Sequence, residues 1–229
     1  MRGGESPSMQ MRQTTPIVLT SGMTERSDVQ FWDRVADRYA ARPIKDVAAY
    51  EAMLADVASR LSASDRVLEI GCGTGGTAIR LAPGVLQWKA TDLSPEMLRI
   101  AQAKPAPANL SFAMAGAELA AGEAPYDAVC AFLILHLVRD LRTSLAAIRD
   151  QLKPGGLLLS KTFCFGDMNI VMRRAVLPAL QAFGMVPPVS VLTLSELRQA
   201  IVDTGFAIEA ERSFGRNRHS HYIVARRSS

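Results

Sequence analysis

Hydrophobic and polar positions along this chain follow two alternating periods, one typical of buried strands and one of amphipathic helices. Short apolar runs with the length and continuity of strands covered on both faces occur at 66–70, 86–91, 109–114, 126–134 and 157–163. Between and after them, helical spacing of apolar residues occurs at 76–81, 94–104, 141–152 and 193–204. This alternation of strands and helices predicts a parallel sheet with helices on both faces, a doubly wound α/β fold.

Two helices are expected before the first strand. Ser27 and Gln30 have the spacing of a capping box, which predicts a helix from Ser27 to the stop at Pro43. A second helix is predicted from Asp46 to about Leu61. Residues 1–26 are predicted to be a disordered tail, and residues 27–229 a single domain in which 27–62 form N-terminal cap helices.

The end of the chain follows a different pattern. Thr193 and Glu196 form a second capping box, which opens the helix that Gly205 ends. Apolar residues then mark strands at 206–213 and 221–226, and the short link between them favours an antiparallel pair at one side of the sheet.

The segment 164–191 is too apolar for a plain connection. Proline at 178 is expected to kink any helix there, and Pro187-Pro188 ends the apolar stretch. We expect an inserted cap that covers a hydrophobic or aromatic small molecule. A dimer contact and ordinary core packing are the alternatives.

A glycine-rich loop follows the first strand, in the run Val67-Leu-Glu-Ile-Gly-Cys-Gly-Thr-Gly-Gly-Thr77. Glycine has no Cβ, so the backbone N–H groups of such a loop can approach a bound cofactor closely. Asp92 lies 92 − 71 = 21 residues after Gly71, at the tip of the next strand, where a carboxylate can accept both hydroxyls of a ribose. Gly71, Gly73 and Gly76 also fit the dinucleotide pattern, so a nicotinamide cofactor is one interpretation.

Further motifs favour another family. Glu69 interrupts the first strand, Leu-Ser-Pro-Glu-Met97 follows Asp92, and Leu152-Lys-Pro-Gly-Gly156 leads into the fifth strand. Over residues 27–227 the chain resembles the class I S-adenosylmethionine-dependent methyltransferases. The resemblance implies a Rossmann-like, mostly parallel seven-stranded sheet with an antiparallel last strand. A nicotinamide domain would instead repeat its mononucleotide half.

The resemblance also implies how S-adenosylmethionine is held. Its methionine part should lie over Gly71, Gly73 and Gly75, and its ribose should meet Asp92. Glu69 either anchors the loop by accepting its N–H groups or holds the amine of the cofactor through water.

The adenine ring and the cap involve further residues. Leu93 and Met97 are expected to cover one face of the adenine, and Leu133 or Phe132 to limit the other side, although all of these residues can be plain core. Gly116 stands where relatives carry an acid, so the N–H of Ala117 or the side chain of Glu118 is expected to replace it. From the first helix Tyr39 is expected to approach the cofactor, unless it only packs on the core.

His136 follows the fourth strand, where substrate and cofactor should meet. An imidazole with an ordinary pKa can accept a proton near neutral pH, which makes His136 the candidate general base; a structural histidine is the alternative. Methyl transfer from a sulfonium depends mainly on positioning and desolvation, so a base can be absent. His219 and His221 lack further predictable ligands, so no metal is expected.

The composition of the chain narrows the class of protein. The chain has 229 residues, of which 48% are hydrophobic, and a net charge of +4; no apolar run is long enough to span a bilayer. Three cysteines in core-like positions indicate reduced thiols and a cytoplasmic protein. Basic residues near the chain end have no interleaved aromatics, so no nucleic acid is expected.

We therefore expect an enzyme, a monomer or homodimer, that methylates a small hydrophobic or aromatic acceptor. An RNA or protein methyltransferase and a non-catalytic S-adenosylmethionine-binding scaffold are the alternatives.

Overall fold

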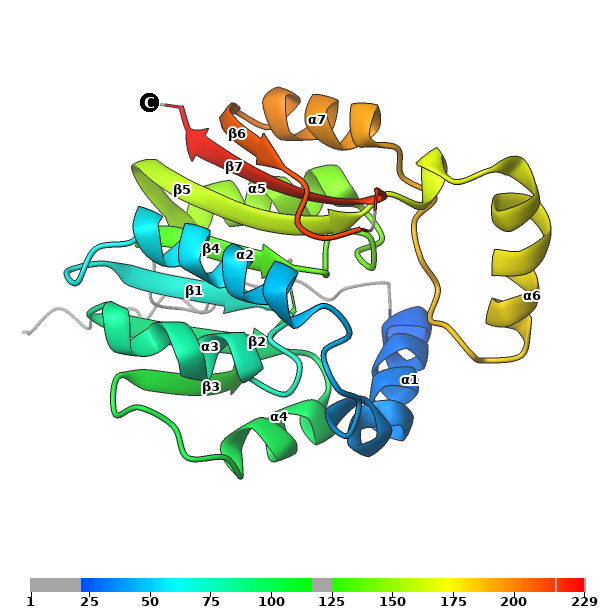
Figure 1. Cartoon of the computed structure of the whole chain (residues 1–229), viewed down its shortest axis with the longest axis horizontal. Helices are drawn as coiled ribbons and strands as arrows, with labels where there is room; N and C mark the ends of the chain where they lie inside the picture. Colours follow the sequence, from blue (N-terminus) through cyan, green and yellow to red (C-terminus); the bar gives the residue numbers. More distant parts are fainter. Residues whose placement is uncertain (1–21, 117–124, 217, 229) are drawn as a thin grey trace, which may run out of the picture.

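The computed structural model describes residues 22–116, 125–216 and 218–228, and builds them around one mixed sheet with the strand order β3-β2-β1-β4-β5-β7-β6 (Figure 1). This confirms the predicted Rossmann-like, seven-stranded sheet. The strands are β1 (Arg66–Ile70), β2 (Gln87–Asp92), β3 (Leu110–Met114), β4 (Tyr126–Phe132), β5 (Leu152–Phe163), β6 (Phe206–Arg212) and β7 (Ser220–Arg227).

The order of the strands follows from their direction. The first five strands are mutually parallel, and helices carry the chain back after β1, β2 and β4. β7 then enters between β5 and β6 and is antiparallel to both, as the short link predicts. β5 begins five residues earlier than expected, because the Lys-Pro-Gly-Gly segment is already extended and Leu152 pairs with Tyr126 of β4.

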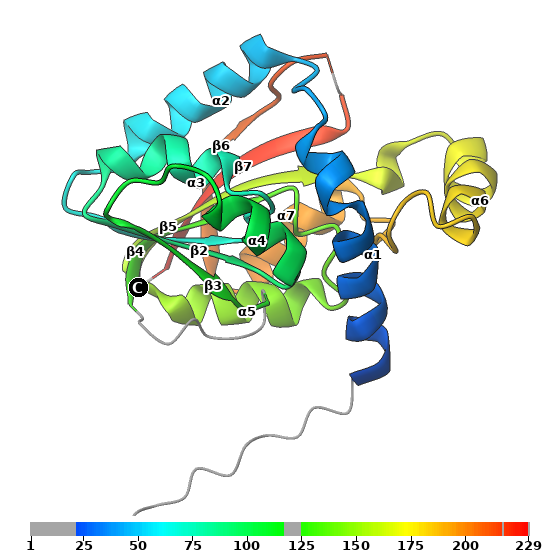
Figure 2. The same cartoon turned by 90° about the horizontal axis from the view of Figure 1, so that it is seen from below.

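Helices cover both faces of the sheet (Figures 1 and 2). Buried side chains from α2, α3 and α4 pack on one face around Trp88, and those from α5 and α7 pack on the other around Leu158. The helix bounds are α1 (Gly22–Ala40), α2 (Val47–Arg60), α3 (Gly76–Leu81), α4 (Pro95–Gln102), α5 (Leu141–Gln151), α6 (Leu177–Ala182) and α7 (Leu194–Asp203).

Caps account for several of these boundaries. Ser94 accepts from the N–H of Met97 and Pro95 is the first residue of α4, as predicted. Thr193 and Glu196 form the predicted capping box of α7. The first helix differs from the expectation: α1 begins at Gly22, so residues 22–26 are helical and the chain is already in a helix when it reaches Ser27.

Two segments lie beyond the carboxyl ends of the parallel strands, α1 and the connection from β5 to α7 that contains α6 (Figures 1 and 2). We call the second one, residues 164–191, the insert. The Arg34 guanidinium of α1 donates to the carbonyl of Gly184, which joins the two segments. The position of the insert at this edge is compatible with the cap that we expect from the sequence.

The helix of the insert runs past its proline, and the kink that we expect there stays a prediction. Pro178 is the second residue of α6, but the helical backbone runs into it without a break, so its missing N–H removes one bond of the helix. A five-residue π-helical turn, Met172–Val176, precedes it, and the N–H of Leu177 donates to the carbonyl of Met172. The wider turn lets the helical path continue into α6.

Among the described residues, none of the helices has the length and apolarity needed to cross a bilayer.

Two adjacent glycines at the start of α3 test how tightly the glycine loop is packed. Gly75 has φ +74°, and a Cβ there would lie 2.9 Å from the Phe112 ring and 3.0 Å from Ala101; Gly76 has open space around it. We expect Gly75→Ala to lower the free energy of unfolding by roughly 2–4 kcal/mol. Gly76→Ala should leave the free energy of unfolding unchanged or raise it by up to about 1 kcal/mol. Urea titration of both variants checks this, and equal stabilities would contradict it.

Candidate functional site

The glycine loop is held open by its backbone conformation. Gly71, Gly73 and Gly75 all have positive φ values, which side chains other than glycine rarely adopt. Gly71 packs so closely against Ile134 that an added Cβ would lie 2.7 Å from its Cγ1. At Gly73, by contrast, the nearest atom to an added Cβ is Cε1 of Tyr39 at 3.8 Å. The middle of the loop is therefore the part a ligand can approach.

Asp92 fixes the loop from the end of β2. One of its carboxylate oxygens accepts the N–H of Gly73 at 2.7 Å, and the other accepts the N–H of Ser94 at 2.9 Å. Burial raises the pKa of Asp92 above its usual value, although these N–H groups favour the charged form. Each carboxylate oxygen has two lone pairs, so both can still accept a hydroxyl. The structure thus brings together the two parts of the expected cofactor site.

Glu69 bonds to a neighbouring strand and not to the loop, whereas its contact with the cofactor amine through water stays a prediction. Its side chain is buried and accepts the indole N–H of Trp88 on β2 at 3.1 Å. The loop N–H groups of Cys72 and Gly73 donate instead to the Thr91 carbonyl and to Asp92, so these two anchor the loop. Burial raises the pKa of Glu69 to about 8, and the carboxyl is therefore mostly protonated at neutral pH.

Tyr39 brings α1 to the loop. Its ring lies beside Gly73 and makes an edge-to-face contact with Trp32, with ring centroids 6.0 Å apart. Burial, followed by the neighbouring charge of Asp92, raises the pKa of Tyr39, so the phenol stays neutral at physiological pH. Tyr39 is 44% exposed, which leaves part of the ring available to a ligand.

Asp33, also on α1, was not anticipated from the sequence. It accepts the Ser94 hydroxyl and the N–H of Glu96 at the start of α4. An acid at this helix N-terminus satisfies N–H groups that lack intrahelical partners. Asp33 thereby connects α1 to the element that follows Asp92. An isolated acid on a polar helix face carries no signal of such a long-range contact.

The residues expected to cover the adenine separate into two groups. Leu93 is 41% exposed and available for contact, whereas Met97 is buried in the core at 2% exposure. Met97 is therefore a packing residue in this structure. Leu93 lies against Gly116, where an added Cβ would be 3.2 Å from the leucine Cδ2. Leucine thus occupies the space beside the position where the resemblance leads us to expect an acid, and Ala117 and Glu118 lie outside the described residues.

Leu133 stands at the end of β4 in a strained conformation. Its φ of 57° makes it the one non-glycine residue with positive φ in the described part of the chain. Its N–H donates to the Lys161 carbonyl at 2.6 Å, and its side chain is 44% exposed. Strain of this kind costs on the order of 1–2 kcal/mol and is typical of functional sites. Its place in the sequence predicted a contact residue, but nothing there indicated the strain.

His136 is buried among aromatic rings. Its centroid lies 5.7 Å from that of Phe165 and 6.4 Å from that of Phe163. The N–H of Phe163 points at Nδ1 over a long 3.5 Å, so the neutral ring carries its proton on Nε2. Burial lowers the pKa of His136 to about 4. Such an imidazole is a weak base at neutral pH, and the contacts favour the structural alternative.

These residues fit a nucleoside cofactor. The loop offers a stretch of backbone near Gly73 with room above it, and Asp92 offers acceptors to vicinal hydroxyls at the same point. Tyr39, Leu93 and Leu133 contribute exposed apolar surface around it. The site can hold a ribose and a flat apolar ring, and it can keep water from a reacting atom.

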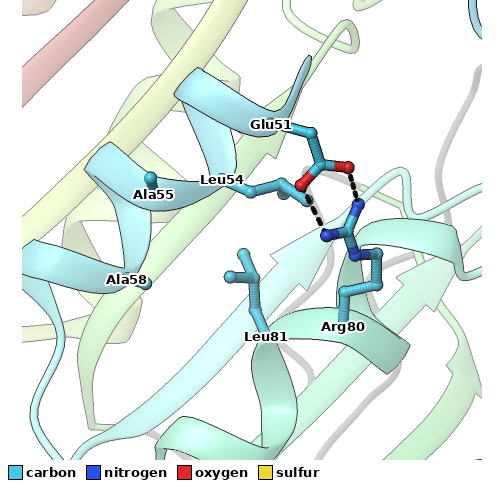
Figure 3. A pocket seen from close by; sticks show the side chains of 6 residues that line it. All are labelled: Glu51, Leu54, Ala55, Ala58, Arg80 and Leu81. Carbon is cyan, nitrogen blue, oxygen red and sulfur yellow. Dashed lines mark hydrogen bonds and ion pairs between the residues drawn. The ribbon is translucent and has the colours of Figure 1, made fainter. Parts of the chain in front are cut away.

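Two other hollows in the structure do not have this chemistry. One is a shallow groove between α2 and α3, lined by leucine and alanine and crossed by the Glu51–Arg80 ion pair (Figure 3). The other lies between α1 and the insert, beside Arg34 and Gly184, and is the seam of their contact. Neither contains a nucleophile or a strained backbone.

The basic residues near the chain end are largely paired within the molecule. Arg226 pairs with Glu209, and Arg227 donates to the carbonyls of Arg149 and Leu152. Arg212 pairs with the buried Asp56 of α2. These contacts stabilise the edge of the sheet.

Comparison with known proteins gives a consistent picture. A family model described as a methyltransferase domain matches residues 67–156, from β1 to the start of β5. The biotin biosynthesis bifunctional protein BioCD of Bordetella avium is 33% identical over 180 residues, which cover 75% of this chain and 38% of that protein. The O-methyltransferase resE of Aspergillus sclerotiorum is 32% identical over 169 residues, which cover 70% of this chain and 62% of that protein.

A solved structure supports the fold. A chain from the complex between the Haloferax volcanii Trm112 methyltransferase activator and a methyltransferase superimposes with a TM-score of 0.69. It is 17% identical and the match covers 89% of this chain and 97% of that one, so it supports the architecture alone. This chain spans less than two thirds of the length of either curated relative named above.

The protonation of Glu69 can be measured through stability. Its pKa in the folded state, about 8, lies above the ordinary value of 4.5, so the folded state binds more protons than the unfolded state between these values. Stability is therefore lost as the pH rises through this window. Glu69→Gln keeps the acceptor for Trp88 and cannot ionise.

We expect Glu69→Gln and the wild type to have similar stability near pH 4.5. Above pH 8 the variant should be more stable by several kcal/mol, with about 5 kcal/mol as the upper bound. Denaturant titrations at several pH values measure the difference. The exposed Glu51→Gln is the control, and a wild type that tracks Glu69→Gln across the range would contradict a neutral Glu69.

The strain at Leu133 has its own test. Glycine relieves a positive φ and alanine does not, so Leu133→Gly should be more stable than Leu133→Ala by roughly 1 kcal/mol. At the exposed Leu86, which has no positive φ, the alanine variant should be the more stable. Thermal unfolding of the four variants checks this, and the same order at both positions would refute the strain.

Proposed function

Because this chain belongs to the class I S-adenosylmethionine-dependent methyltransferases, we propose that it transfers a methyl group from S-adenosylmethionine to a small, hydrophobic or aromatic acceptor. The observation that carries the proposal is the contact between Asp92 and the Gly73 N–H, because it puts a ribose acceptor beside an open glycine loop. The matches cover less than two thirds of the two curated relatives named above, so the products and substrates in their names are not carried over to this chain. Our proposal for the acceptor rests on the surface around the site.

In this proposal, different residues bind different parts of the cofactor. The backbone around Gly73 lies against the amino-acid part of the cofactor, and Asp92 orients the ribose. Tyr39 covers the loop from α1, and Leu93 offers an apolar face to the base. When bound, the sulfonium supplies a methyl group that is already activated for transfer.

The chain then has to align the acceptor and exclude water. Leu133 projects at the end of β4, and its fixed backbone keeps one approach direction. Phe163 and Phe165 at the end of β5 form a tilted aromatic pair, with centroids 4.5 Å apart, that offers apolar surface to a flat acceptor. His136 packs against both rings and is better suited to positioning them than to removing a proton.

The insert would complete this enclosure as a cap. Its exposed apolar side chains include Ile170 and Val171 near its start and Phe183 and Met185 near its end. The bond from Arg34 to Gly184 joins it to α1, which carries Tyr39. A hydrophobic acceptor would bury part of this surface.

Calorimetric titration of the whole chain with S-adenosylmethionine, S-adenosylhomocysteine and NADH tests the proposal. We expect the first two to bind and NADH not to bind. Asp92→Asn keeps the shape but loses the charge, and should weaken binding by roughly 10- to 100-fold, as expected for hydrogen bonds to a charged group. Asp150→Asn, an exposed acid on α5, is the matched control.

The outcomes separate the alternatives. Unchanged binding in Asp92→Asn would contradict the site, and binding of NADH alone would contradict the function. Mass spectrometry of reactions with a panel of phenols and quinols then detects methylated products. Binding without any product, also with RNA and peptide acceptors, would leave a non-catalytic scaffold.

A further inference from the structure

Three potential metal ligands come together at the junction between the sheet and the insert. Cys164 follows β5 directly, Asp167 ends the short 3-10 turn Phe165–Asp167, and His221 lies on β7. The thiol, carboxylate and imidazole ligand atoms all lie within 4.8 Å of one another. From the sequence we expect no metal at His221, because its potential partners Cys164 and Asp167 are far from it along the chain.

Strand pairing explains why Cys164 and His221 meet. Thr162 is in register with His221, and the N–H of Cys164 donates to the His219 carbonyl at 2.7 Å, which extends the β5–β7 pairing by one residue. Side chains two residues apart lie on the same face of a strand, so Cys164 and His221 are diagonal neighbours on the side of α7.

The 3-10 turn brings the third ligand. The N–H of Asp167 donates to the Cys164 carbonyl at 3.3 Å, which closes a tight turn with two residues between the ligands. Gly166 in this turn packs so closely on the start of α7 that an added Cβ would lie 2.6 Å from Thr193. One Asp167 oxygen accepts the N–H of Leu194, and a carboxylate has a second oxygen. The turn is therefore a rigid holder for two ligands.

We propose that Cys164, Asp167 and His221 bind a zinc-like divalent transition-metal ion. A mixed sulfur, nitrogen and oxygen set is typical of Zn²⁺, which takes four ligands at about 2.0–2.3 Å in a tetrahedron. These bond lengths require the three ligand atoms to approach by about 1 Å from their present separation, which side-chain rotation supplies. Water takes the fourth position, and the thiol releases its proton to solvent on binding.

Two further observations at the same place favour a bound ion. Thr162, in register with His221, is fully buried, and its hydroxyl has no hydrogen-bond partner among the residues that the structure describes. Such a hydroxyl can bond to a metal-bound water or to a ligand. Arg198 faces the cluster, but both of its bonded nitrogens pair with Glu211 at 2.7 Å, so its charge opposes a bound cation less.

The ion would join three elements at the base of the insert. Cys164 and Asp167 lie at the first residues of the insert, and His221 belongs to the sheet. A metal there fixes the direction in which the insert leaves β5. Because the site involves neither the glycine loop nor Asp92, metal binding can be measured separately from cofactor binding.

The test uses the whole chain after dialysis against a chelator. Zn²⁺ is added and the bound metal is counted by elemental analysis; Co²⁺ is added to a second sample for its absorption spectrum. We expect one ion per chain, a thiolate-to-cobalt charge-transfer band and a rise in melting temperature on addition of Zn²⁺. Cys164→Ala should remove all three, and His221→Gln should weaken binding at least tenfold.

Control variants keep the result interpretable. Cys130→Ala removes another buried thiol, on β4, and should leave metal binding unchanged. Circular dichroism confirms that each variant is folded. Absence of binding to the folded wild type, or full binding and an unchanged cobalt spectrum in Cys164→Ala, would overturn the proposal.

Discussion

The hydrogen bond from the Gly73 N–H to Asp92 is the contact on which the rest of the site depends. It joins the end of β1 to the end of β2, and it forms only because glycine permits a left-handed backbone at this point. Ser94 and Asp33 extend it to α4 and α1, so the cover over the site is attached to the same carboxylate. A substitution in the glycine loop would therefore also affect the position of α1, which covers it.

Two acids on neighbouring strands show how surroundings decide charge. Glu69 and Asp92 are both removed from water, but Asp92 receives backbone N–H groups that stabilise its anion, whereas Glu69 receives the single indole N–H of Trp88. Burial consequently dominates at Glu69 and moves its pKa to about 8. The sequence predicts that both acids matter, but only the partners of each reveal that one carries charge and the other is neutral.

The fold could be predicted from local patterns because the residues within each helix and strand, and those at its ends, indicate its type and its bounds. Apolar runs located the strands, and caps such as Ser94 and Thr193 located helix starts. Contacts between distant segments could not be predicted in this way. Met97 proved to be core, Glu69 met Trp88 instead of the loop, and His221 came to lie beside Cys164 through pairing of β5 with β7. The strained backbone of Leu133 likewise accompanies a bond to the distant Lys161, which no local pattern predicts.

The position of β7 between β5 and β6 has a consequence for biosynthesis. β6 is made before β7 but is joined to the sheet only through it. While the ribosome is still adding β7, β5 is an unpaired edge and the apolar face of α7 has an incomplete partner. Until β7 is in place the nascent chain thus keeps an unpaired, aggregation-prone edge at β5, which chaperone binding during translation would protect.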